Sequence, residues 1–148
     1  ADKDLPEEVI GILADCGYDC AGNIIRKVIR QMGLPVGPAY PFVKLGAKLF
    51  GRFDLEAVSP LKALPQAKVP VIFFHGEDDA FVPCYMSKAN YEACSAKKRL
   101  VTVPGAGHGL SYPVAPEEYL NALFVQRHKT KTTGKSDTRM SSLNYTEN

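Results

Sequence analysis

The sequence predicts an α/β fold built around a parallel sheet. Three short apolar runs, at residues 9–14, 69–74 and 99–103, have the length and composition of buried strands. Unbroken apolar runs are typical of parallel strands that are covered on both faces. Glycine and polar residues follow each run directly. Because α/β proteins place their chemistry at the carboxyl ends of parallel strands, we expect functional residues along one edge of this sheet.

Helices are predicted between and after these strands. Apolar residues recur at helical spacing over residues 24–32, and Gly33 is suited to end that helix. Proline is favoured in a first helical turn, and Pro83 and Pro116 stand where two further helices are expected to begin. The sequence thus alternates strands and helices, as a parallel sheet with helical crossovers requires.

The segment between the first two strands is longer than a simple crossover needs. It is rich in proline, glycine and aromatic residues between positions 34 and 53, and residues 42–50 are its best helix candidate. The apolar side of that helix faces either a substrate cleft, as part of a cap, or the sheet, as an ordinary surface helix. The residues themselves leave both arrangements open.

Composition indicates one globular domain with no charged partner. The 148 residues are 45% hydrophobic and 23% charged, which is ordinary for a soluble domain with a core, and the net charge is only +2. The basic excess lies in residues 127–148, which are polar and lack interleaved aromatics over 127–140. We therefore expect a solvated, disordered tail rather than a nucleic-acid site. No apolar run approaches the ~20 residues of a membrane span.

The cysteine pattern favours reduced thiols and no metal. Cys16 and Cys20 lack the second close cysteine or histidine pair of a zinc site, and nothing in the sequence indicates a cofactor. The chain is rich in apolar residues and shows no signal peptide, so buried thiols and a cytoplasmic location are expected. The other two cysteines are Cys84 and Cys94.

Two loops carry the residues best suited to chemistry. Residues 75–83 read His-Gly-Glu-Asp-Asp-Ala-Phe-Val-Pro, so an apolar strand leads into a glycine turn with three acids. Residues 104–109 read Pro-Gly-Ala-Gly-His-Gly, and the glycines allow the bends that bring one histidine close to a partner. Because the loops follow neighbouring strand candidates, Asp79 and His108 could meet at the same end of the sheet.

This pair of loops resembles the α/β-hydrolase family. The family's acid loop reads His-Gly-x-x-Asp-x-x-Val-Pro, which matches residues 75–83, and its histidine loop reads Gly-x-Gly-His-Gly or similar, which matches 105–109. The acid precedes the histidine, as the family's order Ser, Asp, His requires. The resemblance covers roughly residues 5–126.

The resemblance implies a partial α/β-hydrolase fold. The three strands would be the family's last three parallel strands, six to eight, with flanking helices. The long segment, about residues 20–66, then falls where the family inserts a helical cap. Residues 1–126 would form the C-terminal part of the hydrolase domain, and 127–148 the tail.

The resemblance also assigns roles to the two loop residues. Asp79 would be the triad acid and His108 the general base, which takes a proton from a serine and returns it to the leaving group. The alternative for His108 is a loop histidine bonded to backbone. The rival acids are Glu77 and Asp78, expected to be solvated or to cap the next helix. Of the other two histidines, His75 ends a strand and is expected to have a structural role, and His128 is expected to be solvated.

The nucleophile is expected to lie outside these residues. No Gly-x-Ser-x-Gly elbow occurs, and neither Ser59 nor Ser111 sits in a strand-turn-helix elbow. Cys16 follows a strand but lacks the elbow's glycine spacing, so a packing role is expected. The first five strands and the serine would then precede residue 1. The open edge of residues 9–14 would require an N-terminal half or self-association to complete the sheet.

Three hypotheses for function follow. In the first, the chain is the C-terminal half of a serine hydrolase that acts on an ester, thioester or peptide-like acyl bond and is inactive alone. In the second, it is a truncated, non-catalytic module that binds a partner or ligand. In the third, it is an unrelated open-sheet domain, such as a flavodoxin-like one, in which the aspartate and histidine are incidental. A large separation of Asp79 and His108 in the structure would favour this third hypothesis. Upstream coding sequence with an in-frame Gly-x-Ser-x-Gly would separate the first from the second.

Overall fold

Three parallel strands form a single sheet in the order β1-β2-β3, so that β2 lies in the centre. The computed structural model describes residues 5–57 and 59–132, with the side chains given up to residue 124. The strands are β1 (Ile12–Asp15), β2 (Val71–Gly76) and β3 (Lys98–Val103). This architecture confirms the predicted α/β class and the contiguous order of the three strands.

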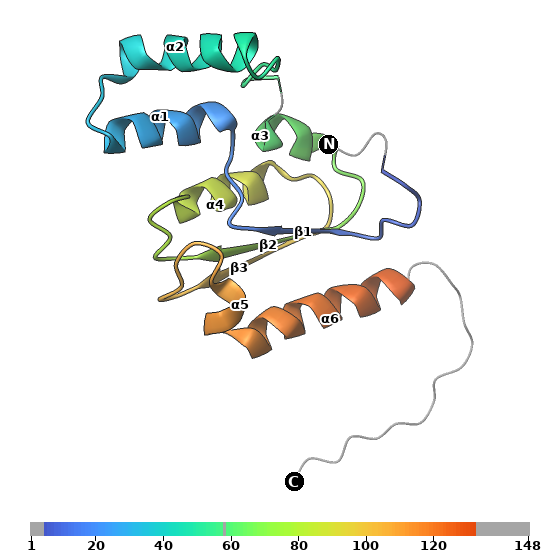
Figure 1. The fold of residues 1–148 in the computed structure, drawn as a ribbon. Coiled ribbons are helices and arrows are strands. Elements are labelled where there is room, and N and C mark those ends of the chain that lie inside the picture. The colour runs from blue at the N-terminus through green and yellow to red at the C-terminus, as the bar shows by residue number, and fades with distance from the viewer. Residues whose placement is uncertain (1–4, 58, 133–148) are drawn as a thin grey trace, which may run out of the picture.

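Helices cover both faces of the sheet (Figure 1). Figure 1 shows α3 and α4 on one face and α5 and α6 on the other, with α1 and α2 stacked together beyond the first face. The helices are α1 (Ala21–Gln31), α2 (Val36–Leu49), α3 (Pro60–Ala63), the 3-10 turn η1 (Leu64–Gln66), α4 (Cys84–Ala93), α5 (Ser111–Val114) and α6 (Pro116–Thr132).

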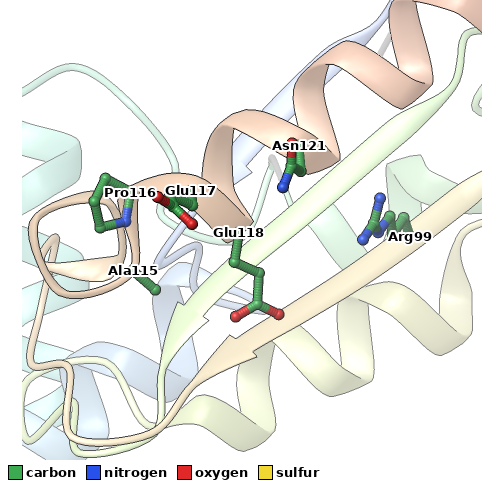
Figure 2. A pocket seen from close by; sticks show the side chains of 6 residues that line it. All are labelled: Arg99, Ala115, Pro116, Glu117, Glu118 and Asn121. Atoms are coloured by element: carbon green, nitrogen blue, oxygen red, sulfur yellow. The ribbon is translucent and has the colours of Figure 1, made fainter. Parts of the chain in front are cut away.

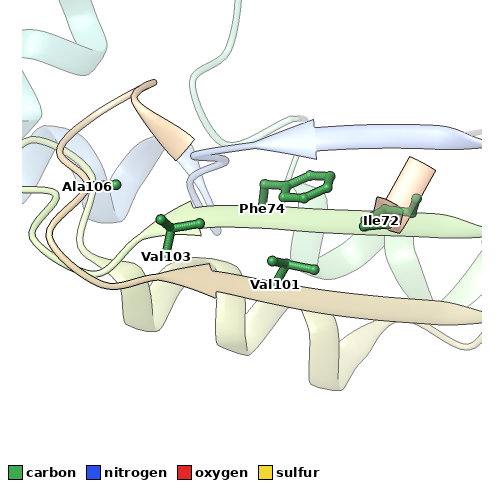
Figure 3. Packing of buried hydrophobic residues seen from close by; sticks show 6 residues of the cluster. Ile72, Phe74, Val101, Val103 and Ala106 are labelled. Atoms are coloured by element: carbon green, nitrogen blue, oxygen red, sulfur yellow. The ribbon is translucent and has the colours of Figure 1, made fainter. Parts of the chain in front are cut away.

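The central strand supplies both halves of the core because its side chains alternate between faces. Ile72 and Phe74 point toward α6 and pack with residues of β3, as Figure 3 shows. Val71 and Phe73 point the other way and pack with Leu64 of η1 and with Cys94 at the end of α4. All six residues of β2 are buried, so this strand holds the loop that follows it in a fixed place.

The first strand starts three residues later than its apolar run, at residue 12 rather than 9. The cause lies in the neighbouring strand. Ile12 N–H donates to the carbonyl of Pro70, and Ile12 is opposite Val71. The next ladder bond toward residue 9 would need an N–H at position 70, which proline lacks. The predicted boundary of residues 9–14 is therefore wrong at both ends, since the ladder continues to Asp15.

The second strand is displaced in the same direction. It runs through His75 and Gly76, which the sequence places in a turn, because these residues pair with Thr102 and Val103 of β3. The first two residues of the acid loop, 75–83, therefore belong to β2, and the part outside the strand begins at Glu77, beside the end of β3.

A helical hairpin occupies the segment between β1 and β2. Its turn is closed by Gly33, which adopts φ +73° while Leu34 N–H bonds to the carbonyl of Ile29, as a glycine helix stop requires. The second helix begins at Val36, six residues before the predicted 42–50 helix. Pro38 lies in its first turn, where a missing N–H costs nothing, whereas Pro41 lies inside the helix. Arg26 lies over the Tyr40 ring at 3.9 Å and joins the two helices.

The last helix runs from Pro116 to Thr132 and so extends into the segment predicted as a tail, 127–148. Residues 133–148, and the side chain of His128, lie outside what the structure describes. Within the described ranges, no helix is long and apolar enough to cross a membrane.

Candidate active site

The acid loop fixes one carboxylate in a buried position. Asp79 Oδ1 accepts hydrogen bonds from the N–H groups of Phe81, at 2.9 Å, and Val82, at 2.8 Å. The side chain of Asp79 has no exposed surface. By contrast, Glu77 and Asp78 are exposed, and Glu77 accepts a bond from the Thr102 hydroxyl. Of the three consecutive acids, only Asp79 is therefore turned into the protein.

The histidine loop bends back over the end of the sheet. Gly105 and Gly109 take positive φ values, +75° and +69°, which glycine adopts without strain. His108 lies between these bends and keeps 46% of its side-chain surface exposed. The Phe81 ring of the acid loop meets its imidazole edge to face, at 5.1 Å between ring centres.

The two loops bring Asp79 and His108 into direct contact. His108 Nδ1 and Asp79 Oδ2 are 2.7 Å apart. A carboxylate can only accept a hydrogen bond, so Nδ1 carries the proton and, in the neutral ring, Nε2 is the nitrogen with a free lone pair. A half-exposed imidazole with a proton-accepting nitrogen is suited to general acid–base chemistry.

The approach of the two loops depends on a glycine. Asp78 N–H donates to the carbonyl of Ala106, and Glu77 N–H to that of Val103. A Cβ atom built at Gly76 would lie 2.2 Å from the Ala106 carbonyl oxygen and 2.6 Å from that of Gly107. These are backbone atoms that cannot rotate away, so any side chain at position 76 must push the loops apart.

We expect Gly76→Ala to separate the two loops and to lower the free energy of unfolding by about 1–3 kcal/mol, the usual cost of overpacking. Urea denaturation of the chain measures this loss. Gly37→Ala is the matched control, since nothing lies within 4 Å of a Cβ at that helical position, and it should not destabilise the chain. Equal stability of Gly76→Ala and the parent chain would contradict the close approach.

A second histidine, His75, contacts the acid loop from inside the protein. His75 is fully buried; its Nε2 donates to the carbonyl of Val82 at 2.7 Å, and its Nδ1 lies 2.6 Å from the Ser87 hydroxyl of α4. Nε2 is also 3.4 Å from Asp79 Oδ2. The ring thus ties β2, the acid loop and α4 together, which agrees with the structural part expected for this residue.

The three candidate nucleophiles weighed in the sequence already take part in other hydrogen bonds. The Ser59 hydroxyl donates to the Asp19 carbonyl, and the Ser111 hydroxyl to Asp15. Cys16 is buried with φ +51°, and its Sγ accepts the Gly109 N–H at 3.2 Å. Burial raises the pKa of the Cys16 thiol, which keeps it in the less reactive protonated form. Cys16 packs behind the histidine loop, a contact that the sequence did not reveal.

One group of possible metal ligands occurs among the described residues, formed by Cys16, Asp79 and His108 with donor atoms within 4.8 Å of one another. A cation there would have to displace the proton that joins His108 Nδ1 to Asp79 Oδ2 and the Gly109 N–H from the sulfur. The sulfur, the carboxylate oxygen and the imidazole nitrogen already have hydrogen-bond partners in one another or in the backbone. The Asp79–His108 pair is therefore better suited to proton transfer than to holding a metal ion.

The hydrogen bonds to Asp79 also control its ionisation. Burial by itself would raise the pKa of Asp79, but the bonds from His108 and from the Val82 and Phe81 N–H groups outweigh burial and hold the pKa below 3.8, the ordinary value. The carboxylate is therefore ionised at neutral pH and can stabilise a positive charge on His108.

This lowered pKa makes stability depend on pH in a defined direction. Ionised Asp79 stabilises the fold fully above its unfolded-state pKa, and that contribution is lost as the pH falls through the lower folded-state pKa. The unfolding free energy of the parent chain should therefore exceed that of Asp79→Asn at about pH 5, and the difference should shrink at lower pH. Urea denaturation from pH 5 downward measures it. Asp78→Asn, at the exposed neighbour, is the control, and a difference that grows with acid would contradict the assignment.

A hollow of about 660 Å³ lies against the flank of β3 and the start of α6 (Figure 2). Two glutamates, an arginine and an asparagine line it, but neither Asp79 nor His108 does. It is therefore not part of the candidate active site.

No family model matches the sequence. The protein YqkD of Bacillus subtilis is 30% identical over 101 residues, which span 68% of this chain and 33% of YqkD. The bifunctional esterase/perhydrolase DCH of Acinetobacter calcoaceticus is 27% identical over 140 residues, 79% of this chain and 47% of that protein. The chain thus spans between a third and a half of these two relatives.

Solved structures decide the fold. The acylaminoacyl peptidase of Pyrococcus horikoshii superimposes with a TM-score of 0.57 at 14% identity, over 91% of this chain and 22% of the peptidase. The chain has part of the α/β-hydrolase fold. In this fold the motif residues Asp79 and His108 stand at the carboxyl ends of parallel strands and hydrogen-bond to each other. The hypothesis of an unrelated open-sheet domain, which a large separation of Asp79 and His108 would have favoured, is therefore wrong.

Proposed function

We propose that the chain supplies the acid and the general base of a serine hydrolase that cleaves an ester, thioester or peptide-like acyl bond. The observation that carries the proposal is the 2.7 Å hydrogen bond between Asp79 Oδ2 and His108 Nδ1, formed by a buried carboxylate and a half-exposed imidazole. The nucleophilic serine would come from a segment outside the 148 residues. We call residues 1–148 joined to that segment the complete hydrolase.

The geometry suits both proton transfers of acyl hydrolysis. With Nδ1 bonded to Asp79, His108 Nε2 would take the serine proton as the serine attacks the acyl carbon. His108 would then give that proton to the leaving group, and the same cycle with water would release the acid. Ionised Asp79 would hold the required tautomer and stabilise the imidazolium. The serine segment would also have to supply oxyanion donors.

The substrate class is inferred from the relatives and from the helical hairpin. One relative is an esterase and a similar fold belongs to an acylaminoacyl peptidase; both names denote cleavage at an acyl carbon. The hairpin α1–α2 exposes large apolar side chains, among them Phe42 at 73% and Phe50 at 89%. We propose that this hairpin is a cap and that the acyl substrate is a small apolar molecule.

The exposed side of β1 supports a partner that completes the sheet. Among the described strands, β1 pairs only with β2, and Leu13 of β1 and Ile10 just before it are 45% and 59% exposed. An uncovered apolar edge favours pairing with another strand. We propose an N-terminal half of the same hydrolase as the occupant, with self-association as the alternative when that half is absent.

The 148-residue chain alone is therefore expected to self-associate through β1. Sedimentation velocity should show dimers or larger species at micromolar concentration, because two open edges can pair. Leu13→Lys places a charge on that edge and should reduce the larger species, whereas Lys48→Met, on the exposed end of α2, should not. A strictly monomeric, stably folded parent chain would contradict this proposal.

A reducing, cytoplasmic setting is part of the proposal. All four cysteines are free, with Cys16 and Cys94 buried. Intact-mass measurement of protein purified without reductant should find four free thiols.

Fluorophosphonate labelling tests the proposed function, because these probes react with activated serines. The chain alone should remain unlabelled, and the complete hydrolase should be labelled at one serine of the added segment. Asp78→Asn, next to the dyad but exposed, should label like the parent. Labelling of a serine within residues 1–148, or no labelling of the complete hydrolase, would overturn the proposal.

A further inference from the structure

A lysine of the helical hairpin donates two hydrogen bonds to the acid loop. Lys27 lies on α1, and its Nζ donates to the carbonyl of Ala80 at 2.5 Å and to that of Phe81 at 2.7 Å. These carbonyls lie more than fifty residues away along the sequence. The ammonium is thus placed between two consecutive carbonyls of the loop that carries Asp79.

The same two peptide groups hold the Asp79 carboxylate. The peptide that joins Ala80 to Phe81 accepts from Lys27 through its carbonyl and donates to Asp79 Oδ1 through the Phe81 N–H. The next peptide accepts from Lys27 at the Phe81 carbonyl and donates to Oδ1 through the Val82 N–H. Two parallel peptides therefore connect one ammonium to one carboxylate oxygen.

This arrangement strengthens the bonds to the carboxylate. A hydrogen bond to an amide oxygen draws electrons toward that oxygen and makes the N–H of the same peptide a better donor, by about 10–30% per bond. Here the donor to the oxygen is a full positive charge and the acceptor from the N–H is a full negative charge. Lys27 acts on Asp79 without touching it.

Phe81 carries the effect to the histidine as well. Its carbonyl is bound by Lys27, its N–H by Asp79, and its ring meets His108. A shift of Phe81 would therefore alter both the carboxylate and the imidazole that it orients.

We propose that Lys27 is a positioning residue for the Asp79–His108 pair, acting through the two peptides between residues 80 and 82, and that it couples the position of the α1–α2 hairpin to the proton-transfer site. This rests on the proposed function for its catalytic consequence but not for the coupling itself. The neighbouring Arg26 lies against Tyr40 and near Glu56, at 3.9 and 3.7 Å. A movement of the hairpin as a unit would therefore move Lys27 as well.

The coupling is tested by nuclear magnetic resonance on the 148-residue chain in a Leu13→Lys background, which reduces the self-association expected through β1. In Lys27→Met, the amide protons of Phe81 and Val82 should move upfield and exchange faster, and the Nδ1 proton and nitrogen signals of His108 should shift. Lys27→Arg keeps the charge and should retain most of the parent signals. Arg30→Met removes a cation from the exposed last turn of the same helix and is the matched control.

Kinetics of the complete hydrolase give the second readout. Lys27→Met should lower kcat by about 3- to 30-fold, the range of indirect coupling effects, with KM little changed. Lys27→Arg should recover most of the loss. If Lys27→Met shifts the Phe81, Val82 and His108 signals but leaves kcat unchanged, the proposed effect of Lys27 on catalysis is wrong.

The two failures are distinguishable. If Lys27→Met shifts the Phe81, Val82 and His108 signals no more than Arg30→Met does, the coupling is wrong, whatever activity the hydrolase has. If the signals shift as expected but the complete hydrolase cleaves no acyl substrate and takes no fluorophosphonate, the proposed function is wrong and the coupling stands.

Discussion

Replacement of His108 by glutamine is expected to lower kcat of the complete hydrolase by about 10⁵- to 10⁶-fold, as loss of the histidine does in serine hydrolase triads. Glutamine preserves much of the size and can still hydrogen-bond to Asp79, but it has no nitrogen that accepts and returns a proton at neutral pH. KM should change little, because the imidazole acts mainly in the transition state. The initial rate with an activated aryl ester measures the effect.

The matched control for His108→Gln is a variant at another histidine. His75→Gln removes an imidazole that is fully buried and bonded to Val82 and Ser87. It should destabilise the fold but leave far more activity in the folded fraction than His108→Gln does. A folded His108→Gln protein that retains more than about a hundredth of the parent kcat would remove His108 from the role of general base.

Replacement of Asp79 by asparagine is expected to lower kcat by about 10⁴-fold at neutral pH. The amide can still accept the Phe81 and Val82 N–H bonds through its oxygen, so the loop should keep its shape. However, its NH₂ group would then face His108 Nδ1 and favour the tautomer that protonates Nε2. A serine proton could no longer be taken by Nε2, and the imidazolium would lose its counter-charge.

Two comparisons separate this effect from simple damage to the loop. Asp78→Asn, on the exposed neighbour, should keep nearly full activity. The double variant Asp79→Asn, His108→Gln should be no slower than His108→Gln alone, because the two residues act as one unit. Additive losses in the double variant would show that Asp79 does not work through His108.

The sequence predicted the sheet well because its evidence is local. Apolar runs indicate the three strands, and the glycine, proline and acidic residues at 75–83 and 104–109 indicate the turns that follow two of them. The boundaries depend on neighbouring segments: β1 begins at Ile12 because Pro70, which directly precedes β2, cannot donate a hydrogen bond. Likewise, His75 and Gly76 belong to β2 because β3 extends far enough to pair with them.

The meeting of Asp79 and His108 could be expected from the order of the strands, but their surroundings could not. Lys27 reaches the acid loop across more than fifty residues, and Cys16 contacts the histidine loop from the end of β1. Neither residue stands in a recognisable motif. Such contacts arise from how the helical hairpin and β1 are placed in space, which periodicity and spacing do not encode.

The central claim is that His108 and Asp79 serve a serine that the chain itself does not contain. The most direct measurement is a crystal structure of the complete hydrolase after reaction with a fluorophosphonate. We expect the phosphonate on one serine of the added segment, with His108 Nε2 within about 3.2 Å of its oxygen and Asp79 still bonded to Nδ1. A phosphonylated residue beyond hydrogen-bond reach of His108 would contradict the claim.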